Sequence, residues 1–355
     1  MANRYWVLGA GSWNSTNTVN WSDSSGGLGG FSVPTAADNV FFDANSNVGA
    51  TAFTVQMGNS PRVCNDFTAS ALDGTMTLAG NIALVVSGSL TFPATNFTRT
   101  YTGFTTFNAT TTGKTVTTNG VAFGATVTFN GVGGGWTLGS ALTVPTGSTT
   151  TLTNGTLDLQ SYTLSTGLFS STNSNTRTIA FGTGQISCTG TGTVWSTATN
   201  TGLTVTGTGT ISLTNASAKT FAGGGFSYSS VTLNQGGAGA LTITGSNTFG
   251  NITNTTQPAS ILFTAGTTST FSNFSLSGTA GNLITIGSVT AASHTLSKAS
   301  GTVSSDYLSI SRSTATGGAG WYAGANSTDG GNNSGWVFTA PPAPSAGNGN
   351  FLMFF

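Results

Sequence analysis

Apolar and polar residues alternate in many short segments of the chain. Leu203-Thr204-Val205-Thr206 and Leu241-Thr242-Ile243-Thr244 are clear examples. A period of two residues is typical of half-buried β-strands, because successive side chains of a strand point to opposite faces. Turn-forming Gly, Asn and Ser separate these segments, and no segment has a clean period of 3.6 residues. We therefore predict an all-β chain.

The middle of the chain repeats at an almost constant interval. Short strands begin at Tyr228, Phe249 and Phe271, which lie 21 and then 22 residues apart, and Phe107 and Val127 lie 20 apart in similar strands. A repeat of this length that carries only strands and turns predicts a solenoid. We expect a parallel β-helix of about 12 coils, near 60 Å long at a strand spacing of about 4.8 Å.

An antiparallel sandwich is the alternative fold. Asn119-Gly120, Asn130-Gly131 and Asn154-Gly155 are candidate hairpin turns for it. The irregular strand spacing argues against this fold and favours the solenoid.

We divide the chain into four segments. Residues 1–50 form an aromatic N-terminal cap, and residues 51–313 form the β-solenoid of 20–22-residue coils. Residues 314–339 form a C-terminal cap, and residues 340–355 form a Pro-rich linker and an apolar tail.

Five tryptophans lie in the two cap segments. An uncapped solenoid exposes unpaired strand edges, so we expect these aromatic end caps to cover the first and last coils. Stacking on a sugar is the alternative role for these rings. The capping residues are Trp6, Trp13, Trp21, Trp321 and Trp336.

Charge is scarce and balanced. Charged residues make up 5% of the chain, against about 25% in an average domain. The net charge is zero, and no run of Lys or Arg is present, so we expect no nucleic-acid binding. The longest apolar runs have about five residues, where a membrane helix needs about 20, so we expect no membrane insertion. Two distant cysteines, Cys64 and Cys188, predict buried free thiols rather than a disulfide framework.

Candidate chemistry is sparse. All eight acidic residues are Asp, and cleavage of a polysaccharide would need two carboxylates close together. Asp158 and Asp306 are isolated, and turn or cap roles explain Asp38 and Asp43 better. The one histidine, His294, lacks partners at metal-ligand or triad spacing, which indicates a surface or ladder position. We predict no enzyme activity, no catalytic residues, no cofactor and no metal site.

The C-terminal tail is a candidate assembly element. A Pro-rich stretch and a Gly/Asn linker lead to five consecutive apolar residues. Such a tail exposed to water favours aggregation, whereas a groove on another subunit or particle component would bury it. Folding back onto its own solenoid end is the alternative. The docking residues are Phe351, Leu352, Met353, Phe354 and Phe355.

Motifs at both ends of the chain resemble a known group of proteins. They include Tyr5-Trp6-Val7, Asn20-Trp21-Ser22, Asp38-Asn39-Val40-Phe41-Phe42-Asp43, Asp306-Tyr307-Leu308-Ser309-Ile310-Ser311 and Asn332-Asn333-Ser334-Gly335-Trp336. These motifs are similar to those of Gly/Ser/Thr-rich β-solenoid structural proteins of tailed bacteriophages, which are related to bacterial surface-adhesin repeats. The resemblance implies a rod that is exposed on a virion or outside a cell.

The N-terminus shows no signal-peptide pattern, which favours the phage interpretation. We expect a non-enzymatic structural protein of a phage virion, synthesised in the host cytoplasm and placed on the virion surface. It would be an appendage or surface-decorating fibre in contact with host surface glycans. A homotrimer is the expected oligomer, with the tail bound to other virion proteins. Alternatives are a bacterial adhesin at the cell surface, a self-assembling extracellular filament subunit and a polysaccharide-cleaving tailspike.

Overall fold

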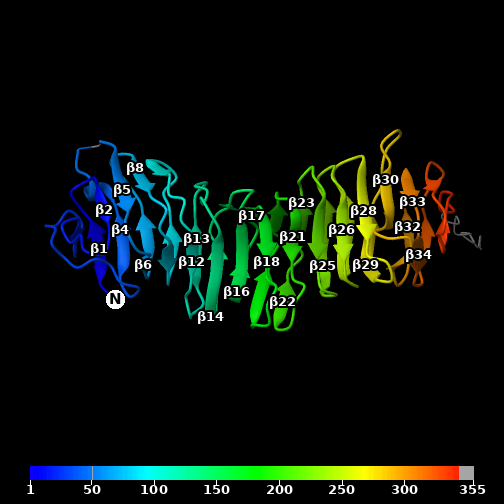
Figure 1. Ribbon diagram of the computed structural model, residues 1–355, viewed down its shortest axis with the longest axis horizontal. Helices are drawn as coiled ribbons and strands as arrows, with labels where there is room; N and C mark the ends of the chain where they lie inside the picture. The colour runs from blue at the N-terminus through cyan, green and yellow to red at the C-terminus, as the bar shows by residue number, and fades with distance from the viewer. Residues whose placement is uncertain (50, 344–355) are drawn as a thin grey trace, which may run out of the picture.

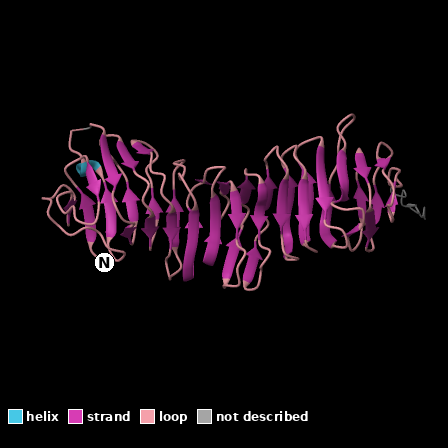
Figure 2. Cartoon of the chain, in the orientation of Figure 1, coloured by secondary structure: helices cyan, strands magenta, loops and turns pink. Residues whose placement is uncertain are grey.

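The computed structural model describes residues 1–49 and 51–343. Within them the chain forms strands and turns, together with one 3-10 helix, η1 (Ala44–Ser46). The strands stack in parallel into a β-solenoid of about 13 turns, roughly 60 Å long at about 4.8 Å per turn. Strand β1 lies at one end of this rod and the last described strands lie at the other (Figures 1 and 2). The predicted all-β parallel β-helix is confirmed.

Two rows of strands run along the rod and belong to one 21-stranded sheet. They are joined because β14 and β16 are long and bend from one row into the other. The first row contains β1 (Asn3–Trp6), β4 (Asn39–Phe42), β7 (Phe67–Ala69), β10 (Leu90–Thr91), β13 (Lys114–Thr117), the second halves of β14 (Val127–Leu138) and β16 (Thr149–Asp158), β19 (Arg177–Ala180) and β22 (Leu203–Thr206).

The second row follows the whole rod after its first coil. It contains β6 (Arg62–Cys64), β9 (Leu84–Val86), β12 (Thr105–Phe107), the first halves of β14 and β16, β18 (Leu168–Ser170), β21 (Gly192–Ser196), β24 (Lys219–Ala222), β26 (Leu241–Thr244), β28 (Ala259–Phe263), β30 (Ile284–Ser288), β33 (Leu308–Ile310) and β36 (Thr328–Asp329).

Three smaller sheets complete the solenoid wall. The nine-stranded sheet contains β15 (Leu142–Thr143), β17 (Thr163–Thr166), β20 (Gln185–Cys188), β23 (Thr210–Leu213), β25 (Ser227–Gln235), β27 (Thr248–Asn254), β29 (Thr268–Ser275), β31 (His294–Ser297) and β34 (Ser313–Thr316). The N-terminal sheet contains β2 (Gly11–Trp13), β5 (Phe53–Met57), β8 (Met76–Ala79) and β11 (Phe97–Arg99). The C-terminal sheet contains β32 (Thr302–Ser304), β35 (Gly320–Tyr322) and β37 (Trp336–Val337).

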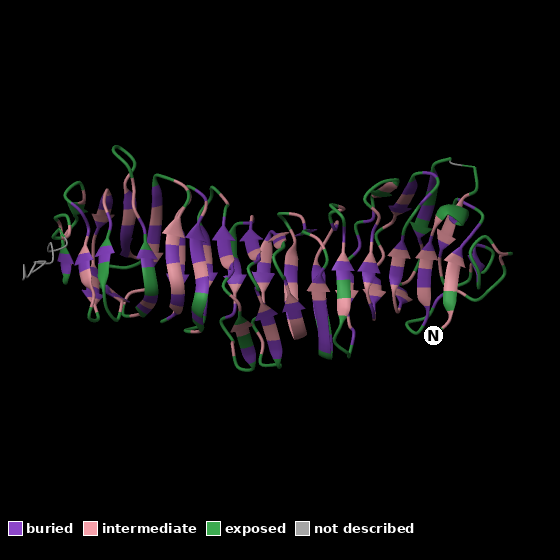
Figure 3. Ribbon diagram, turned by 180° about the vertical axis from the view of Figure 1, so that it is seen from behind, coloured by how far each residue is buried: buried purple, intermediate pink, exposed green. Residues whose placement is uncertain are grey.

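Alternation of burial along each strand builds the core. In β5 the residues alternate between buried and exposed, and in β26 between buried and half-buried. Figure 3 shows the same alternation along the rod. Inward residues of successive coils stack on one another, as in the row Leu241, Ile261 and Ile286. Each coil therefore buries its apolar face only against its neighbours, which is why the stack forms one continuous core.

The aromatic repeat lies in register. Tyr228 pairs with Phe249, and Phe249 pairs with Phe271, with ring centroids 5.6 and 5.8 Å apart. Phe107 instead pairs with Phe129, not with Val127, so the 20-residue offset was wrong by two residues. The coil length also varies more widely than expected, from 15 residues between Trp321 and Trp336 to 44 residues between Gly11 and Val55 in the first coil.

The candidate hairpin turns do not make hairpins. Asn130 and Asn154 lie inside β14 and β16 and face each other across the parallel pair, with the Asn154 amide donating to Asn130 Oδ1 at 2.7 Å. Antiparallel pairing occurs instead at the N-terminal end, where β3 (Trp21–Ser22) pairs with β1. The sandwich alternative is therefore wrong.

Candidate functional site

Hydroxyl side chains form rows on the outer surface of the second strand row. Thr106 pairs with Thr128, Thr128 with Thr151, and Thr151 with Ser170, so one hydroxyl follows another about every 4.8 Å. These side chains are half-buried because each packs against those of the adjacent coils. The surface formed by these rows is thus neutral and polar.

A shallow open pocket of about 470 Å³ lies on this surface. We call it the threonine groove, and its polar lining residues carry hydroxyls and no charge. It draws residues from β16, β18 and β21, which the solenoid brings side by side. The threonine groove consists of Thr126, Thr149, Thr151, Ser170, Thr193 and Ser196. Sequence reasoning missed this groove, although aligning the Thr-x-Thr segments by coil would have indicated it.

Most carboxylates bind nearby backbone and side-chain donors. Asp43 caps η1, and Asp158 accepts from the backbone N–H of Gln160 at 2.9 Å. Burial opposes ionisation of Asp38, but hydrogen bonds from Thr35 and Ala2 outweigh it and hold the pKa of Asp38 below its usual value. Turn and cap roles are thereby confirmed for Asp38 and Asp43.

Asp306 has a similar local role near the C-terminal end. Its carboxylate accepts from the backbone N–H of Tyr307 and from Asn326 in the next coil, at 3.0 Å in both cases. Burial acts against ionisation, yet these bonds lower the pKa of Asp306. In the described residues no three His, Cys or Asp side chains gather into a group that could hold a metal ion.

The histidine and the cysteines are inside the rod. His294 begins β31, is fully buried and stacks on Phe263 with ring centroids 4.7 Å apart. It therefore occupies an inward ladder position, and burial lowers its pKa to about 4. Cys64 and Cys188 are buried and free, as expected. Burial raises the pKa of both thiols, to about 12 for Cys188.

Buried basic side chains are a feature that sequence reasoning missed. Arg177 is 1% exposed and donates to backbone oxygens of two neighbouring coils, including Asn175 O at 2.7 Å and Thr199 O at 2.9 Å. Lys219 Nζ likewise donates to the carbonyls of Asn215 and Gly239. Burial lowers the pKa of Lys219 to about 8. These cations join turns of successive coils and are not available as a basic surface.

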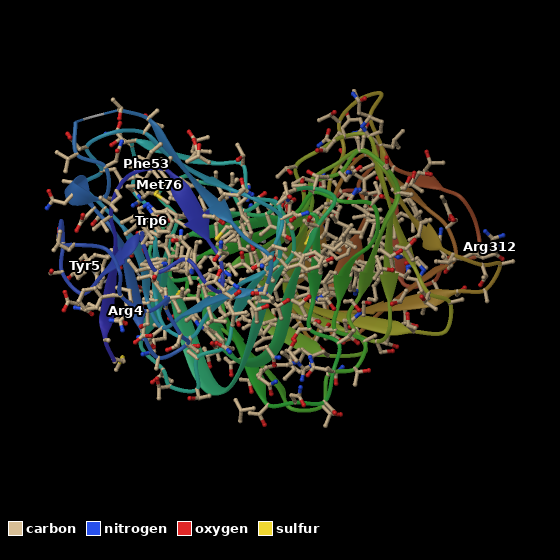
Figure 4. All side chains as sticks on the ribbon, turned by 60° about the vertical axis from the view of Figure 1, so that its left-hand side comes forward. Arg4, Tyr5, Trp6, Phe53, Met76 and Arg312 are labelled. Atoms are coloured by element: carbon tan, nitrogen blue, oxygen red, sulfur yellow. The ribbon has the colours of Figure 1, made fainter. Side chains whose placement is uncertain are left out.

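The N-terminal tryptophans are packed together inside the first coils. Trp6, Trp13 and Trp21 are all fully buried, and the Trp21 ring meets the other two edge-on at 5.1 and 5.4 Å. Figure 4 shows this end of the rod, with Arg4 and Tyr5 near the tip. These buried rings offer no face for stacking on a sugar.

The C-terminal tryptophans form a second aromatic group. Trp321 and Trp336 lie 5.0 Å apart, edge-on, and both contact Phe274 of β29. Both indole N–H groups donate, Trp321 to Thr316 O and Trp336 to Ser313 Oγ. The predicted docking residues Phe351–Phe355 lie outside the described residues.

No protein-family model, curated protein sequence or solved structure matches this chain. In residues 1–49 and 51–343 no helix is long and apolar enough to cross a membrane.

Proposed function

We propose that the protein is a non-enzymatic structural rod of a phage virion, an appendage or surface-decorating fibre that contacts the host. The observation that carries this proposal is the continuous core, which runs through about 13 stacked coils. Such a stack makes a stiff, elongated body from a single chain. The sequence resemblance to phage β-solenoid proteins supports the same role.

The threonine groove is the proposed contact surface for host glycans. Its hydroxyls are spaced along the rod and lie beside half-buried Leu168, so they present hydrogen-bonding groups next to apolar surface. Neutral sugars need this combination, and repeated weak contacts along several rods would add through multivalency. A homotrimer would supply three such surfaces, and the tail would attach the rods to other virion proteins.

Binding to polysaccharide purified from the host surface tests this proposal. We expect saturable binding that changes little between low and high salt, because no charged residue lines the groove. Thr151→Val removes one groove hydroxyl and should weaken binding. Thr204→Val changes an exposed threonine on β22, in the other strand row, and is the matched control.

The outcomes separate the alternatives. Equal binding by both variants and the wild type would remove the groove from the proposal. Release of new reducing ends from the polysaccharide would indicate a tailspike enzyme instead. Antibodies against the rod should label virus particles in electron micrographs, whereas labelling of cell surfaces alone would indicate a bacterial adhesin.

A further inference from the structure

We propose that the N-terminal end of the rod carries a docking groove for residues 351–355 of a second copy, so that copies join head to tail. This inference rests on the proposed rod function and names a second copy of this chain as the virion protein that the tail binds. It combines an exposed apolar surface, a strained leucine and the distance between the two ends of the chain.

Exposed apolar side chains concentrate at the N-terminal end. Among the described residues, eleven large hydrophobic side chains are exposed, and six of them belong to the first 48 residues. Soluble proteins rarely expose a contiguous apolar patch without a binding partner. We call five of these residues the N-terminal patch: Leu8, Val19, Leu28, Phe31 and Val48.

A groove of about 330 Å³ opens within this patch. Leu8 and Val48 line it, and none of its lining residues is charged. Gly27 lines one side and packs closely on Ser22, because a Cβ on Gly27 would lie 2.4 Å from Ser22 Oγ. Gly26 adopts a φ of +66°, a conformation that residues with side chains rarely adopt. The groove is therefore uncharged: Leu8 and Val48 supply apolar surface, glycines supply bare backbone, and Asn45 and Asn47 supply polar amides.

Leu8 is held in solvent by a strained backbone. Its φ is +67°, and its side chain is 66% exposed. The turn is fixed, because the Trp6 indole N–H donates to Gly9 O at 2.6 Å and the Gly9 N–H donates to Ser46 O at 2.8 Å. Gly or Asn would adopt this conformation with less strain. A leucine here points to a contact outside the chain.

Hydrogen bonds and close backbone packing bring the segments of Leu8, Val19 and Leu28 together. The backbone N–H of Val7 donates to Asn20 O, which places Leu8 near Val19. Gly29 lies against Val19, since a Cβ on Gly29 would be 1.8 Å from Val19 O. The exposed side chains of Val19 and Leu28 are thereby held in adjoining segments.

The length of the rod excludes the chain's own tail as the occupant. Residues 344–355 span at most about 40 Å when fully extended. The rod is roughly 60 Å long, and its last described strands lie at the end opposite β1 (Figure 1). A tail that fills the groove must therefore come from another copy. The tail carries no charged side chain and ends in five apolar residues, which suit a groove that has no charged lining and exposes Leu8 and Val48.

Peptide binding tests the groove directly. A fluorescein-labelled peptide of residues 344–355 is titrated with a chain of residues 1–350, which lacks the five apolar residues of the tail. We expect saturable binding. Leu8→Asn should weaken it at least about ten-fold, because one buried leucine contributes that much affinity and Asn tolerates the positive φ. Val132→Ser, at a mid-rod valine that is 75% exposed, is the control and should bind like the parent chain.

Analytical ultracentrifugation tests assembly. The 1–355 chain should form end-to-end oligomers, whereas residues 1–350 alone and full-length Leu8→Asn alone should each remain unassociated by this route. Their mixture should form pairs only, because one supplies the groove and the other supplies the tail.

Three results would overturn the proposal. They are absence of peptide binding, equal weakening by Val132→Ser, and end-to-end oligomers that persist without residues 351–355. Oligomers that need Leu8 but not the tail would mean that two N-terminal ends meet each other. Polysaccharide binding by unassociated rods is measured separately, so failure of head-to-tail joining is distinguishable from failure of the proposed function.

Discussion

Acidification should destabilise the rod through His294. Its Nδ1 lies 2.8 Å from Ser288 Oγ, and its Nε2 is buried without a hydrogen-bond partner among the described residues. The cation would need a partner for that second nitrogen, and burial lowers the pKa of His294 to about 4. In the unfolded chain the pKa returns to about 6.5.

The sign and size of the effect follow from these two values. Above pH 6.5 the ring is neutral in both states, so its contribution to stability is fully present. Below pH 6.5 the histidine is protonated in the unfolded chain but stays neutral in the folded chain. The free energy of unfolding therefore falls until the pH reaches about 4, where the folded chain is protonated as well. Between pH 7.5 and pH 5 the expected loss is about 2 kcal/mol.

His294→Gln is the comparison variant, because a glutamine stays neutral and can still bond to Ser288. The chain contains one histidine, so the range from pH 7 to pH 5 contains no other side chain with an ordinary pKa. Urea unfolding followed by circular dichroism at pH 7.5 and pH 5 measures the difference. An equal loss in both proteins, or an NMR titration of the ring near pH 6.5 in the folded state, would refute the reasoning.

Three further predictions concern the core. Arg177→Met should lower the free energy of unfolding by about 3–5 kcal/mol, because it leaves several buried carbonyls without donors. Arg177→Lys should lower it less, and denaturant titration measures both variants. Trp195→Ala should cost about 3–5 kcal/mol by opening a cavity between Phe169 and Phe221, and a smaller loss in calorimetry would contradict the stacking. The two thiols should resist Ellman's reagent in the native rod and react after unfolding; rapid native labelling would mean that they are accessible.

The fold was predictable because its signals are local. Alternation in Leu241–Thr244 defines a strand without knowledge of its neighbours, and the spacing of Tyr228, Phe249 and Phe271 defines the stacking. The buried thiols followed from the chemistry of free cysteine. The placement of Asp38 and Asp43 at a turn and a helix cap followed from short-range hydrogen bonding.

The sites were less predictable because they depend on register between coils. Phe107 pairs with Phe129 only after the length of the intervening turn is known. The threonine groove needs Thr151, Ser170 and Ser196 to align across three coils of unequal length. No local pattern contains that information.

The sequence by itself determined that this chain is a neutral parallel β-solenoid with aromatic ends. The reason is that the strand period and the repeat length can be read from the order of residues without knowledge of tertiary contacts. Tertiary structure alone decided what the polar and charged residues do. Arg177 is buried because carbonyls of two coils converge on it, and Leu8 is exposed because a hydrogen-bonded turn holds it outward. Both outcomes arise from contacts between residues far apart in sequence, which only the stacking of coils brings together.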